Sequence, residues 1–190
     1  EDIAPITVDT LMSCYNTFYD PSNMALCISG DIDENVVFAA ADKYFKPSEG
    51  KVIKQVIPDE PCGIVREFSE KKMPVARPLF NIGIKDNNCS VVGRELVKKE
   101  LATEMLLEIM FGQSTPFYKK LYDDGVINSE FDAAFECSET FGFCLFAGES
   151  DAPEKVLDAI RDEISGIFKN GISKKRFLQV RNTVYGNIVA

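Results

Sequence analysis

Apolar side chains recur with helical spacing in two segments of the first part of the chain. Residues 7–19 carry them three and four positions apart, and Thr7 stands where an N-cap is expected. Asp31, with Glu34 three residues later, resembles a capping box and predicts the start of a second helix. Between these helices, residues 24–29 form an apolar run with the length of a buried strand. The pattern therefore predicts an α-β-α segment.

Proline and glycine are concentrated in residues 46–63, with charged residues between them. Pro47 and Gly50 are expected to end the second helix, and the whole stretch is the strongest candidate for a linker. We therefore place a domain boundary near residue 60. Because a single strand cannot form a sheet, the segment before this boundary is expected to pack against a partner.

Beyond the linker, short alternating patterns are followed by helical ones. Residues 64–68 and 79–85 each read as a strand. A long apolar stripe predicts a helix over residues 92–111, and a shorter helix is expected over residues 115–122 with Ser114 as its cap.

A hairpin is predicted next. Apolar residues alternate over 131–137 and again over 141–147, and residues 138–140 form a plausible loop. Two helices follow, the first capped by residues 151–154 and the second by Ser173. The order β-β-α-α-β-β-α-α argues for an α+β domain with a mainly antiparallel sheet covered by helices.

The chain is acidic, with a net charge of −9 over 190 residues. This charge disfavours nucleic acid and anionic lipid as partners, whereas it suits solubility or the attraction of basic peptides. No run of 18 apolar residues is present, so we expect no membrane span. Nor do we expect a signal peptide, since the first five residues are acidic and lack an apolar region. The missing initial Met indicates a processed or excised segment, and the chain is expected to be truncated at its C-terminus.

Six cysteines are present without a CxxC pair, at positions 14, 27, 62, 89, 137 and 144. A chain with 45% hydrophobic residues has enough core to fold without disulfides. Three of the cysteines lie within apolar runs, where cysteine usually acts as a small buried hydrophobe. We therefore expect reduced thiols and a cytoplasmic location.

The chain contains no histidine. This absence excludes Ser-His-Asp and Cys-His nucleophile systems and the usual histidine-bearing zinc sites. Two acidic groups were considered as cation sites, namely Asp31-Ile32-Asp33-Glu34 and Asp123-Asp124-Gly125. Neither has the ligand spread of a calcium loop, so helix capping and turn formation explain them better. We assign no catalytic, cofactor-binding or metal-binding residue in this chain.

Two other groups of residues have a functional and a structural interpretation. The basic clusters Lys71-Lys72 and Lys174-Lys175-Arg176 are short and are expected to be solvated. The phenylalanines at 80, 131, 135, 141, 143 and 146 could line a peptide groove, although such residues more often form the core.

Several segments together resemble the peptidase M16 (pitrilysin-type) family of zinc peptidases, in the form found in bacterial subunits of Firmicutes type. They follow one another in the family's order and cover nearly the whole chain: residues 6–11, 18–26, 29–33, 43–45, 113–122, Phe131 with 148–155, and 171–173 with Phe177. The resemblance implies a two-layer α+β domain of the M16/LuxS-like kind. It also implies that residues 1–57 end a preceding domain of the metal-bearing type, that residues 58–63 are a linker, and that residues 64–190 form a second M16-type domain.

Family members bind zinc through an HxxEH motif and a later Glu, which lie before the stretch that this chain resembles. None of these residues can be assigned here, so zinc is implied only for a parent protein. The family's partner half often carries an Arg and a Tyr for substrate binding. In this chain Tyr122 stands where that Arg would be, and no equivalent Tyr follows. The chain is therefore more similar to the second domain of the zinc-bearing half.

The resemblance implies a non-catalytic fragment that contributes chamber wall, contacts to peptide or unfolded protein, and contacts to another M16-type half or subunit. A fragment of an inactive M16-like scaffold and an independent α+β module that binds peptides are the alternatives. Open sheet edges could also pair between copies and give a homo-oligomer.

Overall fold

The computed structural model describes residues 3–46, 50, 53–54, 56, 60–88 and 91–189. The chain divides into two compact units, residues 1–57 and 58–190, which are described separately. Pro47, Pro58 and Cys89, which figured in the sequence predictions, lie outside the described residues.

In the described part of the first unit, the chain forms two α-helices and a short 3₁₀ helix. Helix α1 (Val8–Phe18) starts at Thr7, whose side chain accepts a hydrogen bond from the backbone N–H of Thr10, as the sequence predicts. The 3₁₀ helix η1 (Pro21–Asn23) follows. Helix α2 (Glu34–Tyr44) is capped by Asp33, and the prediction of Asp31 as the cap is wrong.

The strand predicted at residues 24–29 is not formed, so the expected α-β-α segment is wrong in its middle element. The stretch lies outside regular secondary structure, and its apolar side chains are exposed, Leu26 at 60%. A strand needs a neighbour for its backbone hydrogen bonds, and no described strand pairs with this stretch.

The second unit is an α+β domain built on a three-stranded antiparallel sheet. Its strands are β1 (Leu79–Lys85), β2 (Asp132–Cys137) and β3 (Gly142–Glu149), in the order β1-β3-β2. Phe146 of β3 lies opposite Ile82 of β1 and Ala133 of β2, which fixes the register across the sheet. These strands agree closely with the sequence predictions for 79–85 and for the hairpin.

The strand predicted at residues 64–68 is absent. Val65 is 99% exposed and Phe68 is 77% exposed, so these side chains pack against no sheet. Packing within a sheet is what favours such residues in strands, and it is missing here. The order of elements in this unit is therefore β-α-α-β-β-α-α, with one strand fewer than expected.

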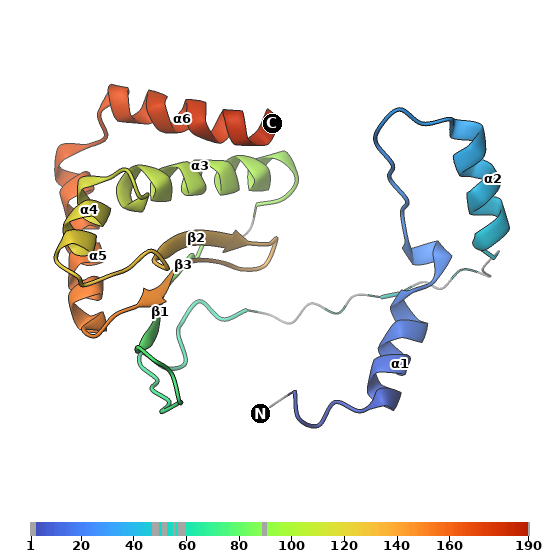
Figure 1. Ribbon diagram of the computed structural model, residues 1–190, viewed down its shortest axis with the longest axis horizontal. Coiled ribbons are helices and arrows are strands. Elements are labelled where there is room, and N and C mark those ends of the chain that lie inside the picture. Colours follow the sequence, from blue (N-terminus) through green and yellow to red (C-terminus); the bar gives the residue numbers. More distant parts are fainter. Residues whose placement is uncertain are drawn as a thin grey trace. The chain divides into compact units, whose positions relative to one another are not determined.

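Four helices accompany the sheet: α3 (Arg94–Phe111), α4 (Pro116–Asp123), α5 (Pro153–Asn170) and α6 (Lys174–Val189). Helix α3 lies against β2, and α6 runs along α3 on the side away from the sheet (Figure 1). Gly171 ends α5 with a φ of 71°, a left-handed conformation that suits glycine.

Capping differs from the predictions at two of these helices. Thr115, rather than Ser114, caps α4 by accepting a hydrogen bond from the backbone N–H of Tyr118. The residues predicted to cap α5 do not do so, because Asp151 pairs with Arg77 and the N-cap position is Ala152. Ser173 accepts a hydrogen bond from the backbone N–H of Arg176, as expected for the cap of α6.

The core lies between one face of the sheet and the helices. Four of the six phenylalanines considered for a groove are buried in it, namely Phe80, Phe131, Phe135 and Phe146. Phe146 contacts Phe111 of α3 edge to face, with ring centroids 4.8 Å apart. The core interpretation is therefore confirmed for these four.

The opposite face of the sheet, here called the open face, has a different character. By alternation along the strands it carries Asp132, Ala134 and Glu136 of β2 and Phe143, Leu145 and Ala147 of β3. Asp132 and Glu136 are exposed, whereas the β3 side chains are half-buried. The helix-covered face therefore buries the core, whereas the open face is only partly buried.

Candidate functional site

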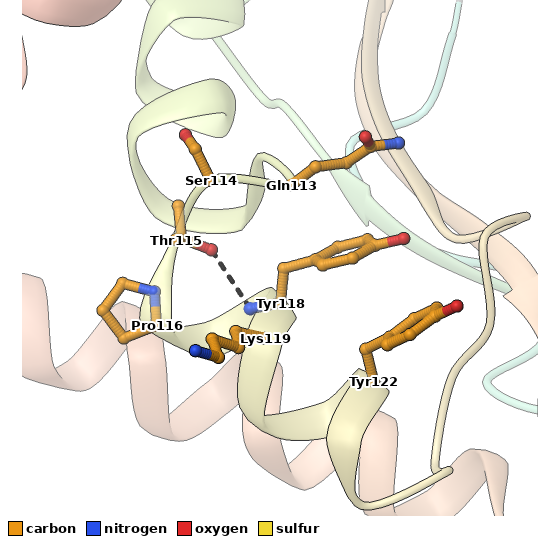
Figure 2. A pocket seen from close by; sticks show the side chains of 7 residues that line it. All are labelled: Gln113, Ser114, Thr115, Pro116, Tyr118, Lys119 and Tyr122. Atoms are coloured by element: carbon orange, nitrogen blue, oxygen red, sulfur yellow. Dashed lines mark hydrogen bonds between the residues drawn. The ribbon is translucent and has the colours of Figure 1, made fainter.

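A pocket of about 460 Å³ lies at the turn between α3 and α4 and along the first turns of α4 (Figure 2). Seven residues line it: Gln113, Ser114, Thr115, Pro116, Tyr118, Lys119 and Tyr122. The same stretch, residues 113–122, carries part of the family resemblance, but its sequence does not by itself predict a pocket.

The wall of the pocket is formed by two tyrosine rings one helical turn apart. Tyr118 and Tyr122 stack with centroids 5.8 Å apart and an interplanar angle of 15°. Tyr118 is buried and also contacts the ring of Phe131, whereas Tyr122 is 50% exposed. The pocket therefore combines one fixed ring with one that faces solvent.

The turn that frames the pocket is held by several hydrogen bonds. The backbone N–H of Thr115 donates to the carbonyl of Gly112 at 2.9 Å, and the Thr115 side chain caps α4. Arg176 of α6 donates to Ser114 Oγ at 2.8 Å and to the carbonyl of Glu108 at 2.9 Å. A contact surface held in this way loses little conformational entropy on binding.

The chemistry of the lining favours binding over catalysis. Its side chains offer hydrogen-bond donors and acceptors, two aromatic faces and the ammonium group of Lys119. They include no carboxylate, thiol or imidazole, so the carboxylate pairs and the His- and Cys-based systems of many hydrolases have no member in this pocket.

The other candidate residues from the sequence have structural positions. The Asp33 carboxylate accepts a hydrogen bond from the backbone N–H of Asn35 at 2.9 Å. Asp123 is the last residue of α4, and Asp124 is its C-cap. Among the described residues, no group of three or more His, Cys, Asp or Glu side chains could hold a metal ion.

Three comparisons place the chain among known proteins. A family model described as "Peptidase M16 inactive domain" matches residues 5–184. The chain belongs to the peptidase M16 family. The matched model is the one that describes the inactive domain of this family.

The chain is also similar to two bacterial proteins. The Bacillus subtilis (strain 168) protein named "Uncharacterized zinc protease YmfH" is 36% identical over 163 residues, which cover 84% of this chain and 38% of that protein. The crystal structure of an M16-like peptidase from Alicyclobacillus acidocaldarius matches 98% of this chain and 45% of its own, with a TM-score of 0.80 and 31% identity. The chain thus spans less than half the length of either relative.

Zinc is the metal that such a relative's name implies, but the residues present here do not fit it. The chain has no histidine, and its described residues bring no metal-binding group together. The described residues of this chain therefore offer no site for a catalytic zinc ion.

None of the helices formed by the described residues has both the length and the apolar content needed to cross a bilayer.

Proposed function

We propose that this chain is a non-catalytic part of an M16-like zinc metallopeptidase and that it supplies chamber wall, peptide contacts and contacts to another M16-type half or subunit. The observation that carries the proposal is the α3–α4 pocket, which is held by hydrogen bonds, aromatic and free of carboxylate, thiol and imidazole groups. Tyr122 lies in this pocket at the position where the family's partner half often has an Arg for substrate binding. A tyrosine ring there can still contact an extended peptide.

We infer that residues 1–57 end a preceding domain of the metal-bearing type, that residues 58–63 are a linker, and that residues 64–190 form the second domain. Support comes from the apolar surfaces of the first unit. Helices α1 and α2 have no buried residue, and Leu11 and Phe38 are 61% and 64% exposed. Exposed apolar side chains gathered on neighbouring helices are typical of a surface that contacts another part of a protein.

The sheet edge and the cysteines bear on the partners and the location of the protein. No described strand pairs with the outer edge of β1, where Asn81 and Gly83 are exposed. This edge can therefore pair with the same edge of a second copy and give a homo-oligomer.

A cytoplasmic location is supported by the described cysteines, which are all free thiols: Cys14, Cys27, Cys62, Cys137 and Cys144.

The test is hydrolysis of unfolded peptides, with added zinc, by this chain and by a protein extended upstream through the implied HxxEH motif. We expect activity only in the extended protein, and we expect a chelator to abolish it. Activity in the histidine-free chain itself would overturn the proposal. Activity in neither protein would contradict the peptidase assignment and favour the inactive scaffold.

A further inference from the structure

A second hollow of the molecule lies between α3 and the start of α6 and has a volume of about 440 Å³. Helix α3 contributes one wall, which includes Leu101, Leu106 and Ile109. Ile172, which precedes α6, and Phe177 of α6 contribute the other. This hollow, here called the α3–α6 groove, shares no lining residue with the α3–α4 pocket.

The lining of the α3–α6 groove is almost entirely apolar. Of its eight residues, only Lys98 carries a charge or a polar side chain. Ile109 is 8% exposed, whereas Leu106, Phe177 and Ile172 are 38%, 43% and 40% exposed. Single exposed apolar side chains are common on proteins, but here three of them line one concave surface, which is typical of an interaction site.

Cations flank this apolar surface on the α6 side. Lys174 and Arg181 lie three residues before and four residues after Phe177, so all three share one face of α6. Both cationic side chains are exposed, and neither makes an ion pair with a described residue. Arg181 donates a hydrogen bond to Asn182 Oδ1, which leaves its charge unneutralised.

The α3 side of the groove carries a third cation. Lys98 lines the groove and is paired with Glu95 at 3.2 Å, but both side chains are largely exposed, so solvent screens this pair. The groove is therefore positive along both walls, although the chain as a whole has a net charge of −9. Such a local charge selects an occupant that carries carboxylates beside an apolar surface.

The walls of the groove favour a helix over an extended segment as the occupant. Helices α3 and α6 lie side by side and run in opposite directions (Figure 1), with Arg176 at the start of α6 bonded to Glu108 near the end of α3. The backbone groups inside both helices are hydrogen-bonded within the helix, so a docked strand would find no backbone partners there. A helix brings its own backbone hydrogen bonds and needs only side-chain contacts.

The length of the groove also suits a helix. Its α3 wall extends from Lys98 to Ile109, which is about three helical turns. An amphipathic helix places apolar side chains at positions i, i+4 and i+7 over a similar length. A flat membrane surface would contact the exposed side chains of the walls but would not reach Ile109.

We propose that the α3–α6 groove binds an acidic amphipathic helix of a partner protein. The apolar stripe of that helix packs on Leu106, Ile109 and Phe177, and its flanking Asp or Glu residues pair with Lys174 and Arg181. This inference goes beyond the proposed function, because it assigns a partner to the outer side of the helix layer and involves none of the residues of the α3–α4 pocket.

The test uses a fluorescent probe helix, Ala-Ala-Glu-Leu-Glu-Ala-Ala-Leu-Ala-Glu-Leu-Glu-Ala-Ala, with binding to the full chain followed by anisotropy. Lys174→Glu/Arg181→Glu should weaken binding about tenfold, because two attractions become repulsions. Lys120→Glu/Lys155→Glu is the matched control, since it reverses two exposed charges on α4 and α5 outside the groove. The control should change the affinity by less than about threefold.

The apolar part of the groove needs its own pair of variants. Leu106→Glu places a carboxylate in the groove and should weaken binding at least about tenfold. Val97→Glu is the control, because Val97 is 53% exposed on the same helix but does not line the groove. It should change the affinity by less than about twofold. Circular dichroism checks that each variant keeps the helical content of the unsubstituted chain.

Altered probes separate helix docking from general attraction of opposite charges. A scrambled probe with the same composition but no apolar stripe should not bind, and a probe with Gln in place of Glu should bind about tenfold more weakly. With photo-leucine as its central Leu, the probe should cross-link to the peptides that contain Leu106 and Phe177. Equal binding of the scrambled probe, or equal losses in a variant and its control, would overturn the inference.

Two other occupants would also overturn it. If the chain sediments with vesicles of phosphatidylglycerol but binds no probe, the surface belongs to a membrane contact. If the chain self-associates in light scattering, Leu106→Glu prevents this and no probe binds, the occupant is a second copy of the chain. Binding of the probe that depends on Leu106, Lys174 and Arg181 is the result that we expect.

Discussion

Arg176 and Ser114, which are 62 residues apart in the sequence, are joined by a hydrogen bond of 2.8 Å from the guanidinium to Ser114 Oγ. The same guanidinium donates to the carbonyl of Glu108 at 2.9 Å. Through Arg176, helix α6 therefore holds the turn that frames the α3–α4 pocket. The sequence predicted this residue as part of a solvated basic cluster, yet its side chain is only 24% exposed.

Replacing Arg176 should destabilise the second unit. Arg176→Ala removes two charge-assisted hydrogen bonds from a mostly buried side chain, and we expect a loss of about 2 kcal/mol in the free energy of unfolding. Urea unfolding followed by circular dichroism is the measurement, since the chain has no tryptophan. Arg161→Ala, which removes an exposed ion pair of 3.8 Å, should cost less than about 0.5 kcal/mol. Equal effects of the two variants would contradict the bridging role.

The core should depend strongly on Phe146. This side chain is 1% exposed, and its replacement by Ala leaves a cavity against Phe111. We expect Phe146→Ala to lower the free energy of unfolding by about 3–5 kcal/mol in the same urea experiment. Phe168→Ala is the control, because Phe168 is 87% exposed, and it should change stability by less than about 0.5 kcal/mol. A small effect at Phe146 would mean that the helix-covered face is not the main core.

The open part of the pocket should affect peptide binding more than stability. In a protein extended through the metal site, Tyr122→Ala should raise KM about fivefold and leave kcat unchanged, because an exposed aromatic contact contributes about 1 kcal/mol. Tyr122→Phe keeps the ring and should retain most of the affinity. A change in kcat alone would place Tyr122 outside the peptide-contact surface.

The acid stability of the second unit should depend on Asp86. Burial raises the pKa of this carboxyl. Hydrogen bonds from Lys99 and from the backbone N–H of Asn88 lower it, as does the positive charge of Lys99, and together they hold the pKa below its ordinary value. A carboxyl with a lowered folded-state pKa contributes stability that is present above about pH 4 and is lost as the pH falls through the folded-state value.

Asp86→Asn should therefore be less stable than the unsubstituted chain at pH 7, and the difference should shrink below about pH 4. Urea unfolding at a series of pH values measures it. Asp158→Asn, at a largely exposed position, should show no such convergence. A constant difference down to the lowest pH would mean that the Lys99–Asp86 pair does not control the pKa.

Local sequence patterns predicted the paired elements well and the unpaired ones poorly. The alternation at 79–85 matches β1, because this strand has a neighbour in β3 along its whole length. The runs at 24–29 and 64–68 have similar composition but no described partner strand. Without such a partner, neither cross-strand hydrogen bonds nor side-chain packing within a sheet stabilises them as strands. Propensity indicates a strand, whereas pairing depends on residues far away in the sequence.

The candidate site was only partly predictable for a related reason. The stretch 113–122 stood out for its family resemblance, and the i, i+4 spacing of Tyr118 and Tyr122 could have indicated stacked rings on one helix face. The pocket itself requires the turn at Gly112 and the bridge from Arg176, which joins residues distant in the chain. Similarly, adjacent Ser114 and Thr115 are equally good caps by composition, and the geometry of the turn selects Thr115.

The thiol of Cys137, the last residue of β2, reports the charge of two carboxylates on α3. Burial raises its pKa, and the carboxylates of Glu100 and Glu104 raise it further. Glu100→Gln/Glu104→Gln should therefore lower the Cys137 pKa, increase the thiolate fraction at pH 8 and speed alkylation by iodoacetamide about two- to threefold. Cys144 is the internal control, since burial and Asp86 raise its pKa and neither glutamate contributes. Peptide mapping by mass spectrometry gives both rates. An unchanged rate at Cys137, or equal acceleration at both cysteines, would show that the charges of the two glutamates do not act on the Cys137 thiol.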